Sequence, residues 1–306
     1  MRYGSVCSGI EAATAAWHSL GWEPAFFSEI EPFPRAVLQH HYPDVPLHGD
    51  FTTIGAEEYG SIDLLVGGTP CQSFSIAGLR GGLDDDRGNL ALEFLRLAQR
   101  TRAKWVVWEN VPGVLSSNEG RDFGAILGGL VELGYGFAYR VLDAQYFGVA
   151  QRRRRVFVVG HLGNWQRAAA VLFERHSLQG HSAPRQQTGT WSGWVFPCLT
   201  RRGPGSLREE EGYVIEACGR IRRLTPVECE RLQGFPDSFT AIPWRGKPAD
   251  QCPDGPRYKA LGNSMAVPVM RWIGERIELV NQFACPPHAK GRSVSLSPLR
   301  PTFSKE

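Results

Sequence analysis

Two reactive side chains follow directly after short apolar runs. Cys71 lies in GGTPCQSFSIAG (residues 67–78), after the run Ile62–Val66, and Glu109 ends the run that begins at Trp105. In an open α/β sheet, ligands bind beyond the carboxyl ends of the strands, so neighbouring strand ends can place a thiol and a carboxyl around one ligand. Most free cysteines are buried and inert, and a glutamate at a strand end can simply be ion-paired. Position alone leaves both interpretations open.

A run of four arginines enters another apolar segment, QRRRRVFVVG at residues 151–160. Because side chains alternate along a strand, Arg153 and Arg155 should share one face, while Arg152 and Arg154 share the other. One pair can then point into a site and the other can meet phosphate or solvent. A solvated, purely structural charge run is the competing interpretation.

The opening segment SVCSGIEAA (residues 5–13) resembles the first turn of a nucleotide-binding sheet, with only one glycine of the G-x-G-x-x-G pattern. The missing glycines argue against a pyrophosphate cradle, and so against an NAD-dependent oxidoreductase or an ATP site. Glu29 and Asp50 follow, and an acid after the second strand of such a fold typically accepts from ribose hydroxyls. An adenosine ligand without phosphates, such as S-adenosylmethionine, therefore fits best.

Alternating apolar runs and amphipathic stretches predict a doubly wound α/β domain, a Rossmann-like parallel sheet with helices on both faces. The expected strands are 2–6, 24–28, 62–66, 105–108 and 156–160, and the expected helices are 10–20, 33–41, 90–100, 122–133, 225–233 and 264–280. Thr225 and Glu228 form a capping box at the start of one helix. Periodicity fails between 161 and 223, which indicates a small loop-rich module.

Composition excludes several classes of protein. The chain has 306 residues, 42% hydrophobic and 21% charged, which is typical of a globular protein and not of collagen, a coiled coil or a disordered chain. Seven scattered cysteines without a C-x-x-C pair disfavour a metal site or a disulfide framework and predict reduced thiols in the cytoplasm. No run approaches the ~18 apolar residues of a membrane span, and the N-terminus lacks a signal-peptide core.

The net charge of +3 conceals a segregation of charge. Residues 1–150 carry 10 basic and 18 acidic side chains, whereas residues 151–223 carry 13 basic and 5 acidic ones. Arginine, which suits phosphate and guanine recognition, supplies 29 of the 34 basic residues. The basic segment therefore predicts a polyanionic partner, although arginine richness can also reflect the base composition of a genome.

Taken together, the motifs resemble the DNA cytosine-5 methyltransferases of bacterial or phage type, in that family's unpermuted order. The resemblance rests on SVCSGIEAA, GGTPCQSFSIAG, WENVPGV, Gln151 with Arg153 and Arg155, RRLTPVECERLQGFPD (222–237) and YKALGNSMAVPV (258–269). It implies sequence-specific methyl transfer from S-adenosylmethionine to carbon 5 of a flipped-out cytosine. Cys71 would add to carbon 6, Glu109 would hold the ring at nitrogen 3 and the exocyclic amine, and Arg153, with Arg155 of the same motif, would contact the base carbonyl and the thiolate region.

The resemblance also assigns residues to the cofactor and to DNA. Those expected at the cofactor are Ser8, Gly9, Ile10 and Glu11 (methionine part), Glu29 (ribose), Ile30, Asp50 and Phe51 (adenine), and Pro70, Asn263 and Ser264. Those expected at DNA are Gln72, Ser73, Arg152, Arg154, Arg201 and Arg202. Two departures matter: Cys7 stands where the family commonly has Phe, and Glu11 and Ala12 stand where glycines are common.

The implied organisation is a catalytic and cofactor-binding domain (1–161), a target recognition module (162–222), a return to the catalytic domain (223–283) and a disordered tail (284–306). We expect a monomer that acts on double-stranded DNA without a metal or a membrane. The sequence leaves open whether the protein acts alone or alongside a restriction endonuclease encoded separately. The alternatives are a tRNA cytosine-5 methyltransferase, whose Cys-Phe-Thr signature is absent, and a catalytically inactive DNA-binding regulator. The target sequence cannot be read from the chain.

Overall fold

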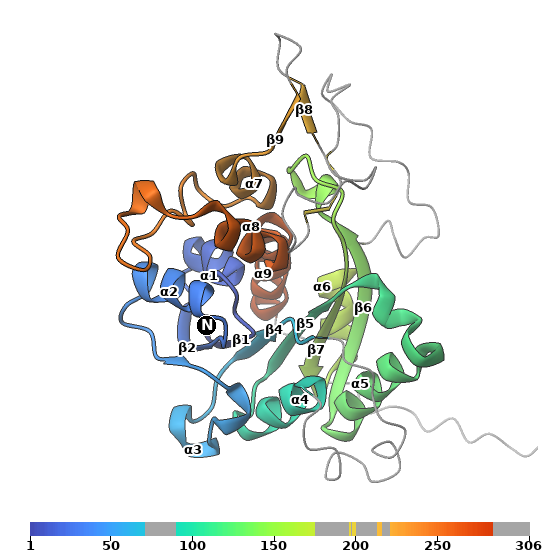
Figure 1. The fold of residues 1–306 in the computed structure, drawn as a ribbon. Coiled ribbons are helices and arrows are strands. Elements are labelled where there is room, and N and C mark those ends of the chain that lie inside the picture. The colour runs from blue at the N-terminus through green and yellow to red at the C-terminus, as the bar shows by residue number, and fades with distance from the viewer. Residues whose placement is uncertain (71–89, 175–195, 197, 200–212, 216–220, 284–306) are drawn as a thin grey trace, which may run out of the picture.

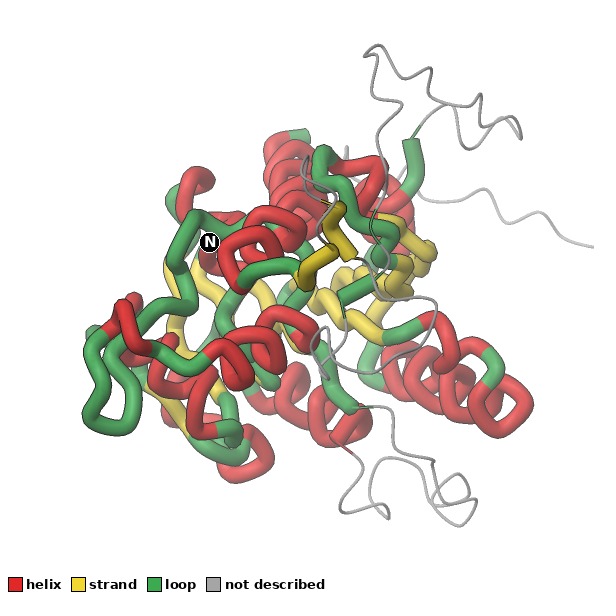
Figure 2. Tube along the Cα trace, turned by 45° about the horizontal axis from the view of Figure 1, so that its top comes forward, coloured by secondary structure: helices red, strands yellow, loops and turns green. Residues whose placement is uncertain are grey.

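The computed structural model describes residues 1–70, 90–174, 196, 198–199, 213–215 and 221–283. Within these ranges the chain forms a seven-stranded sheet with helices on both faces (Figures 1 and 2). The strands are β1 (Arg2–Val6), β2 (Glu23–Ser28), β3 (Leu47–His48), β4 (Leu64–Gly67), β5 (Trp105–Asn110), β6 (Tyr135–Asp143) and β7 (Arg154–Leu162), in the order β3-β2-β1-β4-β5-β7-β6. The predicted nucleophile loop after Pro70 and the tail 284–306 lie outside the described residues.

The predicted doubly wound α/β fold is confirmed, but the expected parallel arrangement does not extend to one edge of the sheet. The strands from β3 to β5 pair in parallel, but β7 runs antiparallel to both β5 and β6. Only residues 144–153 connect β6 to β7, and a parallel crossover needs a dozen or more residues, usually with a helix. The short connection therefore reverses the chain, and the sheet is mixed.

The central strands are apolar on both faces. Along β5, Trp105 and Val107 pack into the core on one side of the sheet, while Val106 and Trp108 pack into the core on the other. This alternation is expected when helices cover both sides of a sheet. It leaves Glu109 as the first charged side chain of β5, where the strand leaves the core.

The principal helices pack on the sheet through these two cores. They are α1 (Ala12–Trp17), α2 (Pro32–His41), α3 (Ala56–Tyr59), α4 (Leu90–Arg100), α5 (Arg121–Glu132), α6 (Trp165–Leu172), α7 (Pro226–Gln233), α8 (Asp254–Asn263) and α9 (Val267–Gln282). Helices α1, α6 and α9 share one core, and α4 and α5 share the other. The fully buried Trp17 of α1 donates from Nε1 to the Met270 carbonyl of α9 at 2.7 Å, which joins the first helix to the last helix of the described residues.

Most of the predicted elements are confirmed to within a few residues, including α4 and the Thr225 capping box at the start of α7. The elements that were not predicted include strand β6, helices α6 and α8, and the short elements β3, α3, β8 and β9. Helix α6 opens the predicted recognition segment 162–222 and packs against the sheet, and the only other described elements of this segment are the short strands β8 (Tyr213–Ile215) and β9 (Ile221–Arg223).

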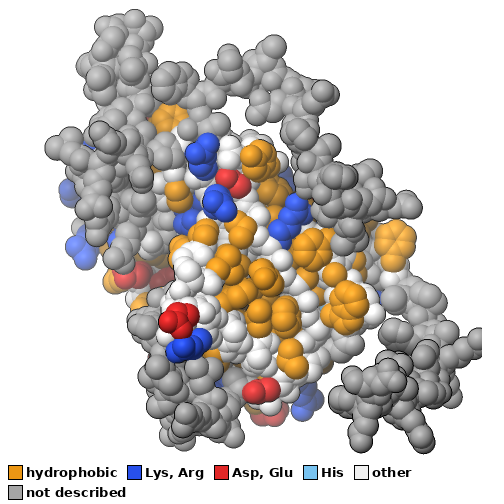
Figure 3. All heavy atoms as spheres, turned by 90° about the vertical axis from the view of Figure 1, so that its right-hand side faces the viewer, with side chains coloured by type: hydrophobic (Ala, Val, Ile, Leu, Met, Phe, Trp, Pro, Cys, Tyr) orange, Lys and Arg blue, Asp and Glu red, His pale blue; other side chains and the backbone are white. Residues whose placement is uncertain are grey.

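Strand β6 forms one edge of the sheet, and this side of the molecule carries apolar side chains at its surface (Figure 3). The exposed large side chains of the elements nearby include Val131, Tyr139 and Trp165.

Among the helices in the described ranges, none is long and apolar enough to cross a membrane.

Candidate functional site

The loop after β1 is held in place by hydrogen bonds to the end of β2. The Ser8 N–H donates to the Ser28 carbonyl at 3.0 Å, and the Gly9 N–H donates to Oε2 of Glu29 at 2.8 Å. Oε1 of Glu29 accepts from the Glu31 N–H, also at 2.8 Å. The carboxylate of Glu29 therefore positions the loop, and its predicted contact with a ribose remains a prediction.

This loop has an unusual backbone. Cys7, Gly9 and Glu11 all have positive φ, at 49°, 56° and 65°. Only glycine adopts this left-handed region without a steric penalty, so two of the three positions are strained. The sequence departs from the family pattern at the same two positions, Cys7 and Glu11.

Glu109 and Arg155 form a mostly buried ion pair at the other side of the site. Oε1 of Glu109 lies 3.1 Å from Nε of Arg155, and the two side chains are 12% and 15% exposed. Burial raises the pKa of Glu109 above its usual range, and the positive charges of Arg155 and Arg153 oppose this rise. The carboxyl is thus held in one orientation in an environment that favours its protonated form more than water does.

Arg153 fastens three segments to one another. Its Nη1 donates to the Leu199 carbonyl at 3.2 Å and lies 3.3 Å from Sγ of Cys198, while its Nη2 donates to the carbonyls of Gly262 and Ser264 at 3.2 and 2.7 Å. The side chain is 3% exposed, and burial lowers the pKa of its guanidinium. Arg153 therefore braces the walls of the site, and its predicted contact with a base remains a prediction.

Gln151 and Gln233 extend this bracing. Both are fully buried, and Nε2 of Gln151 donates to the Leu232 carbonyl at 2.9 Å while its Oε1 accepts from the Leu199 N–H at 3.2 Å. Nε2 of Gln233 donates to the Leu261 carbonyl at 2.6 Å. These contacts join the start of β7 to α7 and to the end of α8.

Side chains of β5 anchor the segment that leads into the predicted nucleophile loop. Trp108 Nε1 donates to Oγ1 of Thr69 at 2.9 Å, and Nδ2 of Asn110 donates to the Thr69 carbonyl at 3.0 Å. Thr69 is 2% exposed, and Glu109 lies between its two anchoring residues. The chain that leaves β4 is therefore fixed beside Glu109 two residues before Cys71.

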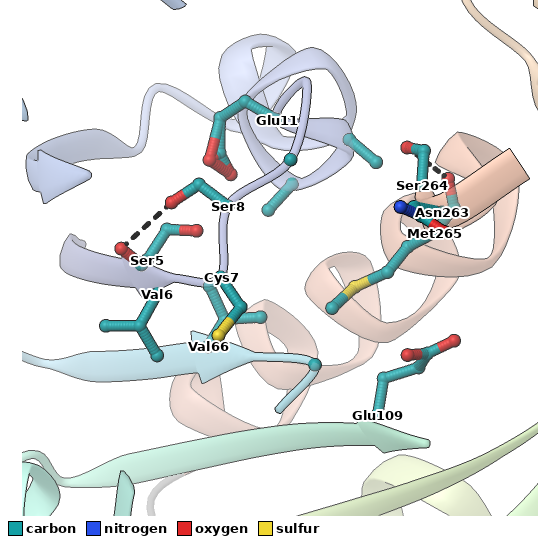
Figure 4. A pocket seen from close by; sticks show the side chains of 14 residues that line it. Ser5, Val6, Cys7, Ser8, Glu11, Val66, Glu109, Asn263, Ser264 and Met265 are labelled. Atoms are coloured by element: carbon teal, nitrogen blue, oxygen red, sulfur yellow. Dashed lines mark hydrogen bonds between the residues drawn. The ribbon is translucent and has the colours of Figure 1, made fainter. Parts of the chain in front are cut away.

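A cavity of about 390 Å³, counted with its open mouth, lies where these segments meet. It is lined by Ser5, Val6, Cys7, Ser8, Gly9, Glu11, Ala12, Ala13, Val66, Gly68, Glu109, Asn263, Ser264 and Met265. Figure 4 shows Glu11 and Glu109 on opposite sides of it, with Asn263 and Ser264 entering from the end of α8. No lysine, arginine or histidine stands among these described lining residues, so the cavity suits a neutral or cationic ligand and not a polyphosphate.

The structure brings some of the predicted cofactor residues together here and leaves others elsewhere. Ser8, Gly9, Glu11, Asn263 and Ser264 line the cavity. The remaining predicted residues do not line it: the side chains of Ile10 and Phe51 are buried in the cores, Ile30 and Pro70 are exposed, and Asp50 caps a short helical turn by accepting from the Thr52 N–H.

The predicted DNA-contacting residues are only partly described. Arg152 and Arg154 are exposed, whereas Arg153 is buried and Arg155 is half-buried, which is the alternation that the sequence predicts. Cys71, Gln72, Ser73, Arg201 and Arg202 lie outside the described residues.

Sequence reasoning missed Cys198 and Gln233. Sγ of Cys198 lies 3.3 Å from Nη1 of Arg153 and 3.7 Å from Nη2 of Arg155, in a segment without periodicity. The sequence predicts Gln233 only as the last residue of a helix. Its position inside RRLTPVECERLQGFPD was the one available signal.

Comparisons with known proteins place the sequence among DNA methylases. The model of the family described as C-5 cytosine-specific DNA methylase matches residues 1–190 and 199–279. The chain is 35% identical to a protein of Escherichia phage P1 named DNA N-6-adenine-methyltransferase, with 90% of this chain aligned to 61% of that protein. It is 31% identical to the type II methyltransferase M2.BsuMI of Bacillus subtilis, over 90% of this chain and 75% of that one.

The fold also matches solved structures. The S. pombe Dnmt2 methyltransferase superposes with a TM-score of 0.67 at 17% sequence identity, covering 92% of this chain and 99% of that chain. Members of the matched family take their methyl group from S-adenosylmethionine. Because the family model spans most of the residues from 1 to 279, the chain belongs to the C-5 cytosine-specific DNA methylase family.

Proposed function

We propose that this protein methylates carbon 5 of cytosine within a specific sequence of double-stranded DNA, with Cys71 as the nucleophile. The observation that carries the proposal is the placement of Glu109. Its carboxyl lines the same cavity as the loop after β1, is oriented by Arg155, and lies beside the anchored segment that leads to Cys71. A thiol and an oriented carboxyl at adjacent strand ends suit addition to a cytosine ring.

Each residue then has a defined role. Carbon 5 of cytosine is a weak nucleophile, so the Cys71 thiolate first bonds to carbon 6 and raises the electron density at carbon 5. Glu109 holds nitrogen 3 and the exocyclic amine, and its raised pKa favours delivery of a proton or a strong hydrogen bond as negative charge develops on the ring. Arg155 keeps that carboxyl aligned, and Arg153 braces the surrounding walls. Carbon 5 would then take the methyl group from S-adenosylmethionine, with S-adenosylhomocysteine as the leaving group. Loss of the carbon 5 proton and elimination of Cys71 would release 5-methylcytosine.

S-adenosylmethionine fits the described cavity. It supplies, when bound, an electrophilic methyl group on a sulfonium, and it carries no phosphate that would need basic residues. The lining residues are hydroxyls, an amide, small apolar groups and two carboxyls, which matches a cationic adenosine ligand. Ser8, Gly9, Glu11, Asn263 and Ser264 would hold it there, with Glu29 supporting the loop.

For the rest of the chain we retain the proposed organisation: a catalytic part in 1–161 and 223–283, and a recognition module in 162–222. The exposed Arg152 and Arg154 would contact the DNA backbone, and arginines of the module would supply affinity and base contacts. The target base must be flipped out, because a thiolate cannot reach carbon 6 within a stacked duplex. We further propose that the protein is monomeric and that a separate endonuclease cuts the unmethylated site.

The product separates this proposal from its competitors. Labelled S-adenosylmethionine should transfer methyl groups to genomic DNA and not to total tRNA, and nucleoside analysis should show 5-methylcytosine. Formation of N6-methyladenine, the product suggested by the name of the phage P1 relative, or transfer to tRNA alone would refute the proposal. Transfer to neither would favour an inactive DNA-binding regulator.

A mechanism-based probe tests the role of Cys71. Duplex DNA with 5-fluorocytosine at the target should trap a denaturation-resistant adduct, because fluorine cannot leave carbon 5 as a proton does. Cys71→Ser should abolish the adduct. Cys252→Ser is the matched control, since Cys252 is buried against the Thr240 carbonyl, and it should retain the adduct. An adduct that persists in Cys71→Ser would assign the nucleophile elsewhere.

A further inference from the structure

Glu11 is a buried carboxyl with no evident structural task. Its side chain is 1% exposed, and Oε2 has no hydrogen-bond partner among the described residues. It stands at the N-cap of α1, near the Ser5 hydroxyl and the Thr14 backbone, and these groups leave its Oε2 unsatisfied. Its backbone is in the left-handed region at φ 65°, where glycine would be unstrained. A residue that is both strained and unsatisfied is commonly retained for a function.

The surroundings of Glu11 call for a cation. It lines the cavity, and none of the other described residues lining that cavity is basic. The nearby ionisable groups are Glu29, Tyr3 and Tyr42, all of which are neutral or negative. An ionised Glu11 therefore has no positive partner supplied by the cavity wall, and a ligand can provide one.

The position of Glu11 in the cavity indicates which cationic group of a ligand lies beside it. It lies across the cavity from Glu109, next to Ser8 on the loop after β1 (Figure 4). The reactive methyl must face Glu109 and the cytosine, so either the adenosyl part or the amino-acid part of the cofactor reaches the end of the cavity beside Glu11. A buried carboxyl with an unpaired oxygen and no basic neighbour in the cavity lining suits the amino-acid part, which carries an ammonium, and not the uncharged adenosyl part. We infer that the carboxylate of Glu11 binds the α-ammonium of the methionine part of S-adenosylmethionine.

Binding of the ammonium should release a proton from Glu11, because the carboxyl of the free protein is mostly protonated at pH 7. Burial raises the pKa of Glu11 to about 8, nearby Glu29 adds to the rise, and hydrogen bonds from Ser5 and the Thr14 backbone only partly oppose it. At pH 7 the free carboxyl is therefore mostly protonated, and an ammonium beside it stabilises the ionised form. Affinity should rise as the pH increases from 6 towards 8. The tyrosines and Cys7 do not interfere, since burial raises the pKa of Tyr3 and Tyr42 further above the usual range and that of Cys7 to about 12.

Calorimetry can test this inference, which rests on the proposed function. The probes are S-adenosylhomocysteine, which carries the α-ammonium but no sulfonium, and methylthioadenosine, which lacks the amino-acid part altogether. Titration at pH 7 in two buffers of different ionisation enthalpy should show release of close to one proton for S-adenosylhomocysteine and none for methylthioadenosine. Glu11→Gln should abolish the release and weaken S-adenosylhomocysteine by about tenfold or more, while leaving methylthioadenosine within about twofold.

Two further variants keep the result interpretable. Glu11→Gly removes the carboxyl and relieves the backbone strain, so it should fold at least as well as the wild type and show the same loss of proton release. Glu109→Gln should retain the release, which excludes the other carboxyl of the cavity as its source. Unchanged affinity or persistent proton release in both Glu11 variants would overturn the inference. Failure of the wild type to bind either probe would instead count against the proposed function.

Discussion

Gly68 offers a direct test of the placement of Glu109. A Cβ atom at this position would lie 2.9 Å from Oε2 of Glu109 and 3.3 Å from Cε of Met265. Ordinary contacts begin near 3.4 Å, so Gly68→Ala must displace the carboxyl by about half an ångström. The side chain cannot simply swing away, because Arg155 holds Oε1 at 3.1 Å.

Displacement of the Glu109 carboxyl should lower kcat. Misplacing a reacting group by 1 Å can cost on the order of 100-fold, so about half an ångström should reduce kcat by about tenfold. The backbone at Gly68 is not in the left-handed region, so alanine itself is tolerated there. We expect Tm to change by less than about 3 °C, because only the movable end of a side chain and a methionine methyl are crowded.

Methyl transfer to DNA, measured with saturating S-adenosylmethionine, is the assay for kcat, and binding of S-adenosylhomocysteine reports separately on the cofactor end. Gly124→Ala is the control, because its new methyl group meets nothing within 4 Å and alanine favours the helix α5. If Gly68→Ala turned over at the wild-type rate, Glu109 would not be the group that acts on the ring in this orientation.

Three further predictions concern stability. Burial and the nearby charges of Arg167 and Lys104 lower the pKa of His161 to about 4, below the unfolded value near 6.5. Between these pH values the unfolded chain binds more protons than the folded protein does. The free energy of unfolding therefore falls as the pH drops from 6.5 to 4. His161→Phe should therefore remove on the order of 2 kcal/mol of acid destabilisation, seen as a flatter profile of urea unfolding against pH. Gly274→Ala would place a Cβ 2.4 Å from Nε1 of the buried Trp17 and should cost about 3 kcal/mol in urea unfolding, and a Tm equal to that of the wild type would contradict this packing. Thr225→Ala should cost about 1 kcal/mol by removing the cap of α7, whereas Thr225→Ser should retain most of it.

The sequence predicts those elements of the fold whose pattern is complete within a few consecutive residues. The strands beneath the site are nearly continuous apolar runs, and the cap of α7 consists of two residues three positions apart, so both were predictable. Strand β6 was not, because it is an edge strand whose buried residues follow no period of two and which contains Arg140. Helix α8 contains two glycines and a proline, which conceal it from any helical periodicity.

The site shows the same division. That Arg153 and Arg155 face one way follows from alternation alone, and so does the exposure of their neighbours. Alternation cannot say that Arg155 meets Glu109 while Arg153 meets the carbonyls of Gly262 and Ser264, because those partners are 46 and about 110 positions away in the chain. The resemblance placed Arg153 at the base, and the structure shows its terminal nitrogens engaged with protein groups.

The bracing by Arg153 has a consequence for how the parts of the site depend on one another. One guanidinium bonds to Leu199, which belongs to the predicted recognition segment, and to Ser264, which lines the cavity. Because the guanidinium is buried, loss of any partner would leave a charged donor unsatisfied at a cost of about 1–3 kcal/mol. Moving one segment away from the other therefore costs free energy. Through Arg153, residues 198–199 and 262–264 are therefore joined into one wall of the site. A change in the recognition segment that shifts Leu199 should alter cofactor affinity as well as DNA affinity, although Leu199 itself does not line the cavity.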